Sequence, residues 1–175
     1  MSFSYIRLHS GKIFDYINPD INSIDIGDIA FSLSHINRYF GHVGNYSVAE
    51  HSVRVSRILS PQYKFAGLIH DFAESYIGDC SSPLKKLLPD YKIIEERVER
   101  VVCEKFGVDW PMRSEVKTAD MILLATELRD LCVGADYKIL EQNGYYPLKD
   151  KIIPWTAKRA EKELLKEYYK LIELK

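Results

Sequence analysis

The chain has 175 residues, of which 46% are hydrophobic and 12% aromatic, a composition that supports a sizeable core and excludes a disordered chain. Its 24 Lys and Arg against 25 Asp and Glu leave a net charge of −1, which argues against binding of a nucleic-acid polymer through bulk positive charge. The apolar runs are too short to span a membrane, and the first residues do not resemble a signal peptide. We therefore expect one domain, residues 1–175, in a cytoplasmic protein without a membrane partner.

The number and spacing of the cysteines are typical of a protein in a reducing compartment. Cys80, Cys103 and Cys132 are odd in number, lie far apart and form no Cys-x-x-Cys pair. This usage is typical of free thiols, and it predicts neither a disulfide framework nor a zinc knuckle.

The first 18 residues predict a β-hairpin. Residues Phe3–Leu8 and Lys12–Ile17 have the composition of strands, and His9–Gly11 between them ends in a glycine that can supply the positive φ of a tight turn. Residues Asn18–Asp20 then break the strand pattern.

The next segment has a helical period. Asp25 is placed to cap a helix in which apolar residues from Ile26 to Ile36 recur every three or four positions. The following residues, 38–46, form a glycine-bearing segment that is unusually aromatic for a connecting loop. We expect a loop there.

Ser47 and Glu50 have the spacing of a capping box. In such a box the Ser47 hydroxyl accepts a hydrogen bond from the Glu50 amide, and the Glu50 carboxylate reaches back to the Ser47 amide. This places a helix start four residues before His51, and Pro61 stops the helix after about Leu59.

Further helices follow along the chain. We expect one at Tyr63–Ile77, ended by Gly78, and, after a loop at 79–83, an amphipathic helix at Tyr91–Phe106. Another spans Ser114–Val133, and one face of it carries Val116, Asp120, Leu123, Leu124, Glu127 and Leu131.

The C-terminal part predicts a short helical turn at 136–142 and a last helix at 156–173, capped by Thr156. The fold class is therefore mostly α, with a small N-terminal hairpin (1–18), a helical core (24–135) and a C-terminal helix.

Three of these helices place polar, metal-competent residues on faces that should be buried. These residues are His51, the doublet His70-Asp71, and Asp120. Burying an unpaired imidazole or carboxylate costs several kcal/mol, so such residues need partners. A divalent transition metal is the simplest common partner, and a mixed nitrogen and oxygen set suits Zn, Co or Mn, with Mg possible at phosphates.

Each residue alone also has a simpler interpretation. His51 could be a core histidine with a satisfied ring, and a His-Asp doublet such as His70-Asp71 is common by chance. Asp120 could pair with Lys117 or Arg129 on its own helix. The metal hypothesis is favoured because one cause then explains three unusual positions.

The combination resembles the HD-domain metal-dependent phosphohydrolases. Their pattern of a histidine, a His-Asp doublet and a distant aspartate on successive helices of a bundle matches Glu50-His51, His70-Asp71 and Ala119-Asp120 here. The spacing His-Asp-x-x-Glu-x-x-x-x-Asp, from His70 to Asp79, is similar to the branch of small nucleotidases. Within that branch the chain looks nearest to phage dATP triphosphohydrolases and bacterial 5′-deoxynucleotidases.

The resemblance implies an HD-domain helical bundle in which His51, His70, Asp71 and Asp120 are the metal ligands. It also implies that Glu74 orients or deprotonates the attacking water, whereas the simpler interpretation is a solvated helix face. Asp79 matches a family acid near the water and sugar, although a plain loop aspartate is the alternative.

The same resemblance suggests four substrate-binding residues. Arg38 matches a family arginine near the substrate phosphate, and Tyr39 could stack on a base. Lys85 and Lys86 could meet the outer phosphates of a triphosphate. All four could instead be solvated surface residues, and His35 and His42 receive no role.

The resemblance thus predicts a divalent-metal-dependent hydrolase of deoxynucleotides. Its sharpest form is a dATP triphosphohydrolase that releases deoxynucleoside and triphosphate, through attack of water on the α-phosphorus. The alternative is a 5′-nucleotidase acting on deoxynucleoside monophosphates, and a hypothesis of another class is a non-catalytic nucleotide-sensing or structural metal module. A small-molecule nucleotide and a homo-oligomer (dimer or hexamer), in the host cytoplasm if the protein is viral, complete the expectation.

Overall fold

The computed structural model describes residues 4–174 of the chain. At the N-terminal end, strands β1 (Tyr5–Arg7) and β2 (Ile13–Asp15) pair antiparallel, with Ile6 opposite Phe14. Gly11 turns the chain with a φ of 87°. The predicted hairpin is confirmed over these residues, while Phe3, which we also placed in it, lies outside the described residues.

The rest of the described chain is mainly helical, as predicted. Its longer helices are α1 (Ile26–His35), α2 (Val48–Ile58), α6 (Pro89–Phe106), α7 (Ser114–Leu131) and α9 (Ala157–Ile172). The shorter helices are α3 (Lys64–Ile69), α4 (Glu74–Ile77), α5 (Ser82–Lys85) and α8 (Lys138–Gln142), and single 3₁₀ turns lie at Ile21–Ser23, Arg38–Gly41 and Pro61–Tyr63. Within residues 4–174, none of these helices is long and apolar enough to cross a membrane.

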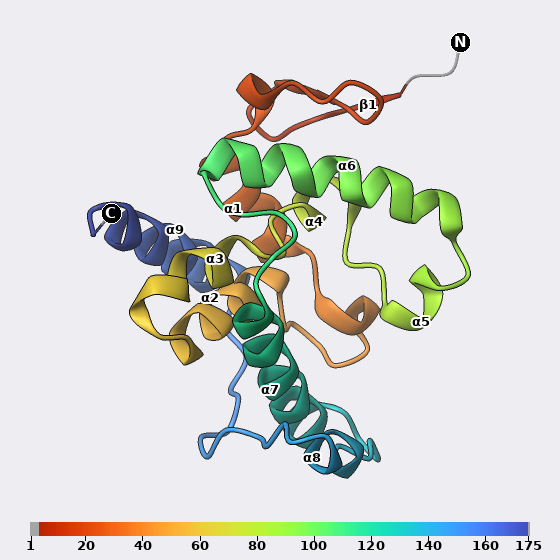
Figure 1. Cartoon of the computed structure of the whole chain (residues 1–175), viewed down its shortest axis with the longest axis vertical. Coiled ribbons are helices and arrows are strands. Elements are labelled where there is room, and N and C mark those ends of the chain that lie inside the picture. Colours follow the sequence, from red (N-terminus) through yellow and green to blue (C-terminus); the bar gives the residue numbers. More distant parts are fainter. Residues whose placement is uncertain (1–3, 175) are drawn as a thin grey trace.

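Helix α2 occupies the centre of the molecule. It packs against α1, α3, α7 and α9, and nearly all of its residues are buried. Figure 1 shows the hairpin above α6 at one end of the molecule and α7 with α8 at the other. A polar side chain on a buried face of α2 must therefore find its partner inside the protein.

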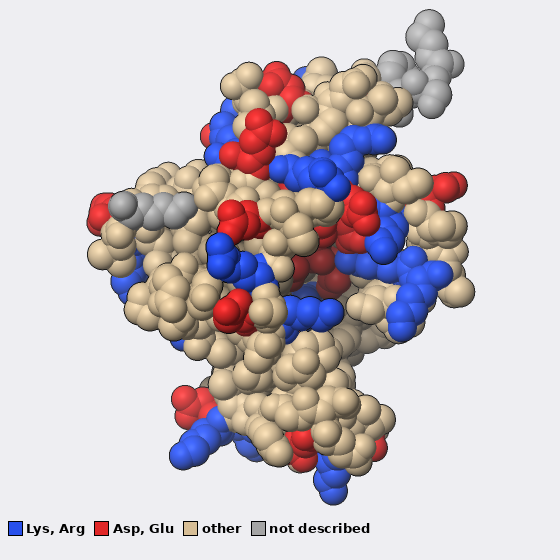
Figure 2. Space-filling view, viewed as in Figure 1, with Lys and Arg blue, Asp and Glu red and all other residues tan. Residues whose placement is uncertain are grey.

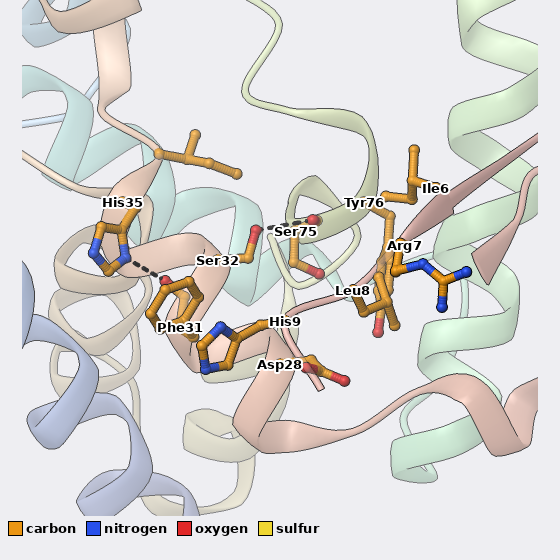
Figure 3. Close-up of a pocket in the computed structure, with 11 residues that line it drawn as sticks. Ile6, Arg7, Leu8, His9, Asp28, Phe31, Ser32, His35, Ser75 and Tyr76 are labelled. Atoms are coloured by element: carbon orange, nitrogen blue, oxygen red, sulfur yellow. Dashed lines mark hydrogen bonds between the residues drawn. The ribbon is translucent and has the colours of Figure 1, made fainter. Parts of the chain in front are cut away.

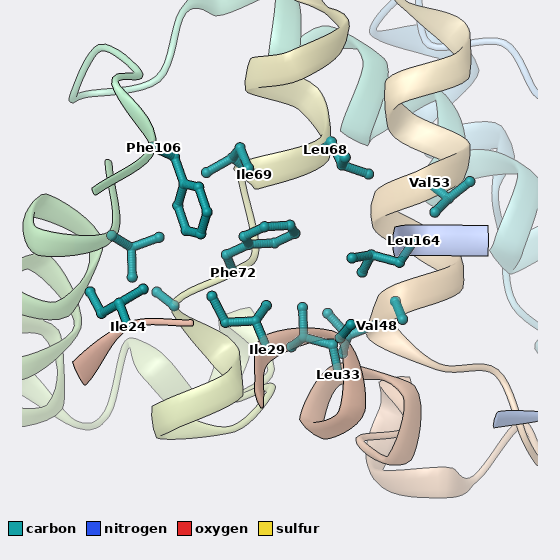
Figure 4. Packing of buried hydrophobic residues seen from close by; sticks show 14 of the residues in the cluster. Ile24, Ile29, Leu33, Val48, Val53, Leu68, Ile69, Phe72, Phe106 and Leu164 are labelled. Atoms are coloured by element: carbon teal, nitrogen blue, oxygen red, sulfur yellow. The ribbon is translucent and has the colours of Figure 1, made fainter. Parts of the chain in front are cut away.

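The main apolar cluster lies between α1, α2, α3 and α9. Figure 4 shows Phe72 in the middle of this cluster, and Phe72, Ile29, Leu33, Val48 and Leu164 are all completely buried. A smaller cluster, which includes Tyr46, Val55 and Leu123, packs α2 against α7. These two clusters fix the angle and spacing at which α2 meets its neighbours.

Helix caps were predicted correctly where they depend on adjacent residues. Asp25 accepts from the Gly27 amide at 2.8 Å, and Thr156 accepts from the Arg159 amide at 3.3 Å. Each accepts a bond from one of the amide groups that a helix start leaves without an intrahelical partner.

The predicted capping box is only half present. The Ser47 hydroxyl accepts from the Glu50 amide at 3.2 Å, but the Glu50 carboxylate does not reach back. It binds Arg54 at 2.9 and 2.7 Å and the Trp155 amide at 2.7 Å instead. The prediction failed because the buried Glu50 carboxylate accepts from the charged Arg54 on its own helix and from the distant Trp155 amide instead.

The single helix predicted at Tyr63–Ile77 is also wrong. It is interrupted at residues 70–73, where the Phe72 and Glu74 amides bond to the carbonyls of Ile69 and Asp71, three residues back, at 2.9 and 3.0 Å. This tighter winding lets Phe72 enter the apolar core while the neighbouring His70 and Asp71 turn to another face.

Smaller boundary differences occur nearby. Helix α5 begins at Ser82, inside the segment predicted as a loop, and α6 begins at Pro89 rather than Tyr91. Proline is favoured in the first turn of a helix because its missing N–H would have had no partner there.

Candidate metal centre and cleft

The four predicted ligands come from three segments and meet at one point. His51 is on α2, His70 and Asp71 are in the turn after α3, and Asp120 is on α7. His51 Nε2 lies 3.1 Å from Asp120 Oδ1 and 3.4 Å from Asp71 Oδ2, and His70 Nε2 lies 3.2 Å from the same Asp71 oxygen. One ligand atom each from His51, His70 and Asp120 falls within 4.8 Å of the others. The alternative pairing of Asp120 with Arg129 is absent, because Arg129 binds Asp130.

The hydrogen bonds of the two imidazoles fix their tautomers. His51 Nδ1 lies 2.6 Å from Glu127 Oε1, and His70 Nδ1 lies 2.8 Å from the Gly67 carbonyl oxygen. Because an ionised carboxylate and a carbonyl can only accept, each Nδ1 must donate, which leaves a lone pair on each Nε2 of a neutral ring. Neither Nε2 has a hydrogen-bond partner among the described residues, although both are buried.

These two rings have the arrangement of metal-binding histidines. Such histidines donate the ring N–H that is not used for the metal to a carboxylate or a backbone carbonyl. Two buried lone pairs facing two carboxylates require a positive charge between them, since acceptors alone repel one another. The residues present therefore fit a divalent cation with mixed nitrogen and oxygen ligands.

The pKa values of His51 and Asp71 also indicate that the cluster favours a positive charge. Burial and Arg38 disfavour the charged form of His51, but Glu127 and Asp120 outweigh them and raise the pKa of His51 to about 9. Burial opposes ionisation of Asp71, yet His70, His51 and Arg38 hold the pKa of Asp71 well below its usual range. Without a cation the cluster would thus bind a proton in its place.

A cleft of about 520 Å³ opens beside this cluster. Its volume lies within the range of roughly 300–1,000 Å³ that is common for small-molecule sites. The charged residues that line it are Arg38, Asp71, Glu74, Asp79, Lys85 and Asp120, and the aromatic or apolar ones include Tyr39, Phe40, Met121, Leu124 and Leu128. Figure 2 shows acidic side chains at the bottom of a hollow between α6 and α7, with basic side chains at its edges.

Glu74 is the first residue of helix α4 and Asp79 lies just after the helix, and both line the cleft. Glu74 is buried, and its Oε2 has no hydrogen-bond partner within residues 4–174. Burial, followed by the charges of Asp71 and Asp79, raises the pKa of Glu74 well above its usual value. Burial also raises the pKa of Asp79. Both carboxyl groups therefore face the cleft as groups that can accept or hold a proton.

Arg38 and Tyr39, two of the predicted substrate-binding residues, line the cleft. Arg38 Nη1 is 3.8 Å from Asp71 Oδ2, and its Nε and Nη2 donate to Glu127 Oε2 at 3.2 and 3.1 Å. Tyr39 and Phe40 adopt left-handed backbone conformations, with φ of 56° and 52°. For residues other than glycine this conformation is strained, and strain of this kind is concentrated at functional sites.

The two lysines are placed differently. The Lys85 ammonium lines the cleft and forms an ion pair with Glu95 on α6. Lys86 is exposed and is not among the residues that line the cleft.

One important residue, Glu127, was assigned no role from the sequence. It is fully buried on α7 and accepts hydrogen bonds from His51, Arg38, Tyr39 and Tyr46. The available signal was its position seven residues after Asp120, on the same apolar face of the helix. A charged residue in such a stripe needs partners, as the other candidate ligands do.

The two histidines without a role lie elsewhere. Figure 3 shows His35 beside Phe31, at a second cavity between the hairpin and α1. The volume of this cavity is about 400 Å³. The Phe31 ring stacks on the His9 ring, with 3.7 Å between the two ring centroids. None of the candidate ligands lines that cavity. His42 is exposed at the end of the turn that follows Arg38.

The amino-acid sequence is similar to those of uncharacterized proteins from two organisms. No protein-family model matches the chain. The chain is 28% identical over 146 residues to the uncharacterized protein RCAP_rcc00048 of Rhodobacter capsulatus, an alignment that covers 75% of this chain and 74% of the relative. It is 45% identical over 141 residues to the uncharacterized protein YfdR of Escherichia coli K12, with 79% of each chain covered. The chain therefore belongs to the same protein family as YfdR.

Proposed function

We propose that this protein is a divalent-metal-dependent phosphohydrolase of the HD-domain type that acts on deoxynucleotides. One observation carries the proposal: two buried imidazoles, each with Nδ1 committed to an acceptor, direct unpartnered Nε2 atoms at Asp71 and Asp120 beside a cleft. The neighbouring Glu74 and Arg38 give this cleft a proton acceptor and a fixed cation.

The ligands of the metal would be His51 Nε2, His70 Nε2 and the carboxylates of Asp71 and Asp120. A Zn, Co or Mn ion bound there would supply Lewis acidity for phosphoryl transfer. Four protein ligands would leave room at such an ion for a water molecule or a substrate oxygen, as a catalytic site requires.

The remaining cleft residues have roles that follow from their charge. The free Oε2 of Glu74 can accept a hydrogen bond from a water molecule in the cleft, which orients that water toward phosphorus, and can then take its proton during the attack. The Arg38 guanidinium can hold a phosphate, while Asp79 can contact the water or the sugar. Attack on the α-phosphorus then forms a P–O bond to water and breaks the bond to the 5′ oxygen of the deoxynucleoside.

The length of the phosphate chain separates two forms of this proposal. Lys85 beside the cleft supports the sharper form, a dATP triphosphohydrolase, because an ammonium can offset the charge of outer phosphates. The ion pair of Lys85 with Glu95 and the exposure of Lys86 favour the second form, a 5′-nucleotidase acting on monophosphates. In the first form, Lys85 must exchange Glu95 for a phosphate.

Product analysis tests both forms directly. The purified protein would be incubated with dNTPs, NTPs and dNMPs in the presence of Mn²⁺, Co²⁺, Zn²⁺ or Mg²⁺, and the products separated by chromatography. Deoxyadenosine and intact triphosphate from dATP would support the triphosphohydrolase. Release of phosphate from monophosphates alone would support the 5′-nucleotidase.

Glu74→Gln is the matched control, because it keeps the shape of the side chain and removes its capacity to accept a proton. An enzyme should lose turnover in this variant and keep its metal. If the wild-type protein binds metal and hydrolyses none of these compounds, the proposal is wrong and a structural or sensing role for the metal is supported.

A further inference from the structure

We propose that Glu127 is a positioning residue that couples the metal centre to the substrate side of the cleft. Its one carboxylate holds the ligand His51 and, at the same time, the strained turn that carries Arg38 and Tyr39. This inference rests on the proposed function for its substrate half, and its metal half stands without it.

The two carboxylate oxygens serve different partners. Oε1 accepts from His51 Nδ1 at 2.6 Å and from the Tyr46 hydroxyl at 2.9 Å. Oε2 accepts from Arg38 Nε and Nη2 at 3.2 and 3.1 Å and from the Tyr39 hydroxyl at 2.7 Å. A carboxylate has about four lone-pair sites, so these five hydrogen bonds from four residues leave none of the sites free.

Glu127 does not itself face the reacting groups. It is fully buried and is not among the residues that line the cleft. It can act on a substrate only through the residues that it holds, which makes it a positioning residue and not a catalytic one.

The turn on the Oε2 side needs an external anchor. Tyr39 and Phe40 are held with φ of 56° and 52°, a conformation that persists in such residues only when surrounding contacts enforce it. The backbone bonds that close the turn, from the His42 amide to the Tyr39 carbonyl and from the Arg38 amide to the Tyr46 carbonyl, are local. Glu127, on α7, is the partner that ties the side chains of Arg38 and Tyr39 to a distant helix.

On the Oε1 side, Glu127 must hold His51 in one tautomer. An acceptor at Nδ1 keeps the proton there and leaves the Nε2 lone pair for a cation. If a donor replaced that acceptor, the proton would move to Nε2 and the ring could no longer bind a metal through that atom.

These two requirements predict how substitutions should differ. Glu127→Ala removes the acceptor on both sides, so both the metal affinity and the substrate affinity should fall. Glu127→Gln keeps the shape but has one acceptor oxygen for two sets of donors, so it can satisfy His51 or the Arg38 turn but not both.

The experiment measures the two halves separately. Mn²⁺ binding to the metal-free protein would be measured by calorimetry, and the KM and kcat for dATP at saturating Mn²⁺. For Glu127→Ala we expect Mn²⁺ to bind roughly 10- to 100-fold more weakly, the loss typical when the partner of a ligand histidine is removed. We also expect the KM for dATP to rise at least tenfold. Glu127→Gln should recover one of these two quantities and not the other.

Tyr46→Phe is the matched control. It removes one donor from Oε1 and leaves His51, Arg38 and Tyr39 in place, so both quantities should stay at their wild-type values. The proposal is overturned if a folded Glu127→Ala or Glu127→Gln protein matches the wild type in both quantities.

A measurement on the wild-type protein covers the case in which the variants do not fold. Nitrogen-15 NMR of the Zn²⁺-loaded protein reports which ring nitrogen of His51 carries the proton. A proton on Nδ1 supports the proposal, and a proton on Nε2 contradicts it. Failure of the proposed function would look different, because the wild type would then turn over no nucleotide while the Mn²⁺ affinities still separated Glu127→Ala from the wild type.

Discussion

Two buried glutamates have similar surroundings but different hydrogen-bond partners, and therefore different roles. Glu50 on α2 and Glu127 on α7 are both completely buried, and each accepts hydrogen bonds from an arginine and from other donors. The donors to Glu50 are Arg54, one turn along the same helix, and the Trp155 amide, just before α9. The donors to Glu127 include His51 and Arg38, which face the metal centre and the cleft.

The pKa values of the two carboxyl groups are shifted in opposite directions. Burial raises the pKa of Glu50 above its usual value, despite the bonds from Trp155 and Arg54. Burial opposes ionisation of Glu127 as well, but Arg38 and His51 lower the pKa of Glu127 to about 2. Complete burial of a carboxylate therefore does not mark a site, whereas the chemistry of its donors does.

The largest effect that we expect is on the free energy of unfolding when metal is added, and it tests the difference between the two glutamates. At a free Mn²⁺ concentration about 1,000 times Kd, binding to the folded state alone adds about 4 kcal/mol to the free energy of unfolding. We expect this increase, measured by urea unfolding after chelation and again with Mn²⁺, in the wild type and in Glu50→Gln. His51→Ala should lose it entirely. A metal response in His51→Ala would place the metal elsewhere.

Glu50→Gln should cost stability and nothing at the metal centre. The carboxamide replaces a charged acceptor of bonds from Arg54 and the Trp155 amide, and hydrogen bonds to charged groups contribute about 1.5–3 kcal/mol each to stability. We expect the free energy of unfolding of the metal-free protein to fall by about 2–3 kcal/mol. The Mn²⁺ affinity of the folded variant should equal that of the wild type, and a weaker affinity would show that Glu50 also acts on the site.

Asp130 has a structural role similar to that of Glu50, and we expect its replacement to have a smaller effect on stability. It accepts from Arg129 at 2.7 Å and from the Ile152 amide at 2.8 Å, which ties the segment before α9 to the end of α7. Burial opposes ionisation, but these two donors lower the pKa of Asp130 below its usual value. At neutral pH we expect Asp130→Asn to lower the free energy of unfolding by about 1–2 kcal/mol.

The effect of Asp130→Asn should depend on pH in a defined direction. Because the pKa of Asp130 is lower in the folded than in the unfolded protein, its stabilisation is present above the unfolded value of about 3.9 and is lost as the pH falls through the folded pKa. Urea unfolding at a series of pH values should show the variant and the wild type converging in acid. A difference that stays constant with pH would contradict this assignment.

Much of the scaffold could be predicted from local sequence. The hairpin turn at Gly11 and the caps at Asp25 and Thr156 depend on residues a few positions apart, and the structure confirms them. The meeting of His51 with His70 and Asp120 was predictable because polar residues on buried helix faces need shared partners.

The remainder depends on contacts that no local pattern encodes. One partner of the Glu50 carboxylate is the backbone amide of Trp155, more than a hundred residues away, and the carboxylate binds this amide and Arg54 instead of the Ser47 amide. The role of Glu127 depends on how α7 crosses α2, which the sequence alone does not specify. The break at residues 70–73 buries Phe72 in the core and at the same time leaves its neighbours His70 and Asp71 beside His51.

The left-handed turn at Tyr39 and Phe40 is another such feature, and it leads to the smallest effect we expect. Phe40 is 60% exposed, so it gains little from burial, yet it pays the steric cost of a φ of 52°. Glycine adopts this conformation without that cost of roughly 1–2 kcal/mol, although it loses more backbone entropy on folding. We therefore expect Phe40→Gly to raise the free energy of unfolding by at most about 1 kcal/mol.

The same substitution should weaken the site while it stabilises the fold. Phe40 lines the cleft, so its removal should raise the KM for dATP with no change in Mn²⁺ affinity, because its apolar side chain offers a metal ion no ligand atom. Tyr5→Gly is a suitable control, since Tyr5 is also exposed but lies in a strand, where glycine lowers stability. A loss of stability in Phe40→Gly comparable to that in Tyr5→Gly would mean that the turn is not strained. In that case the anchoring of Arg38 by Glu127 would have to be explained by the hydrogen bonds alone.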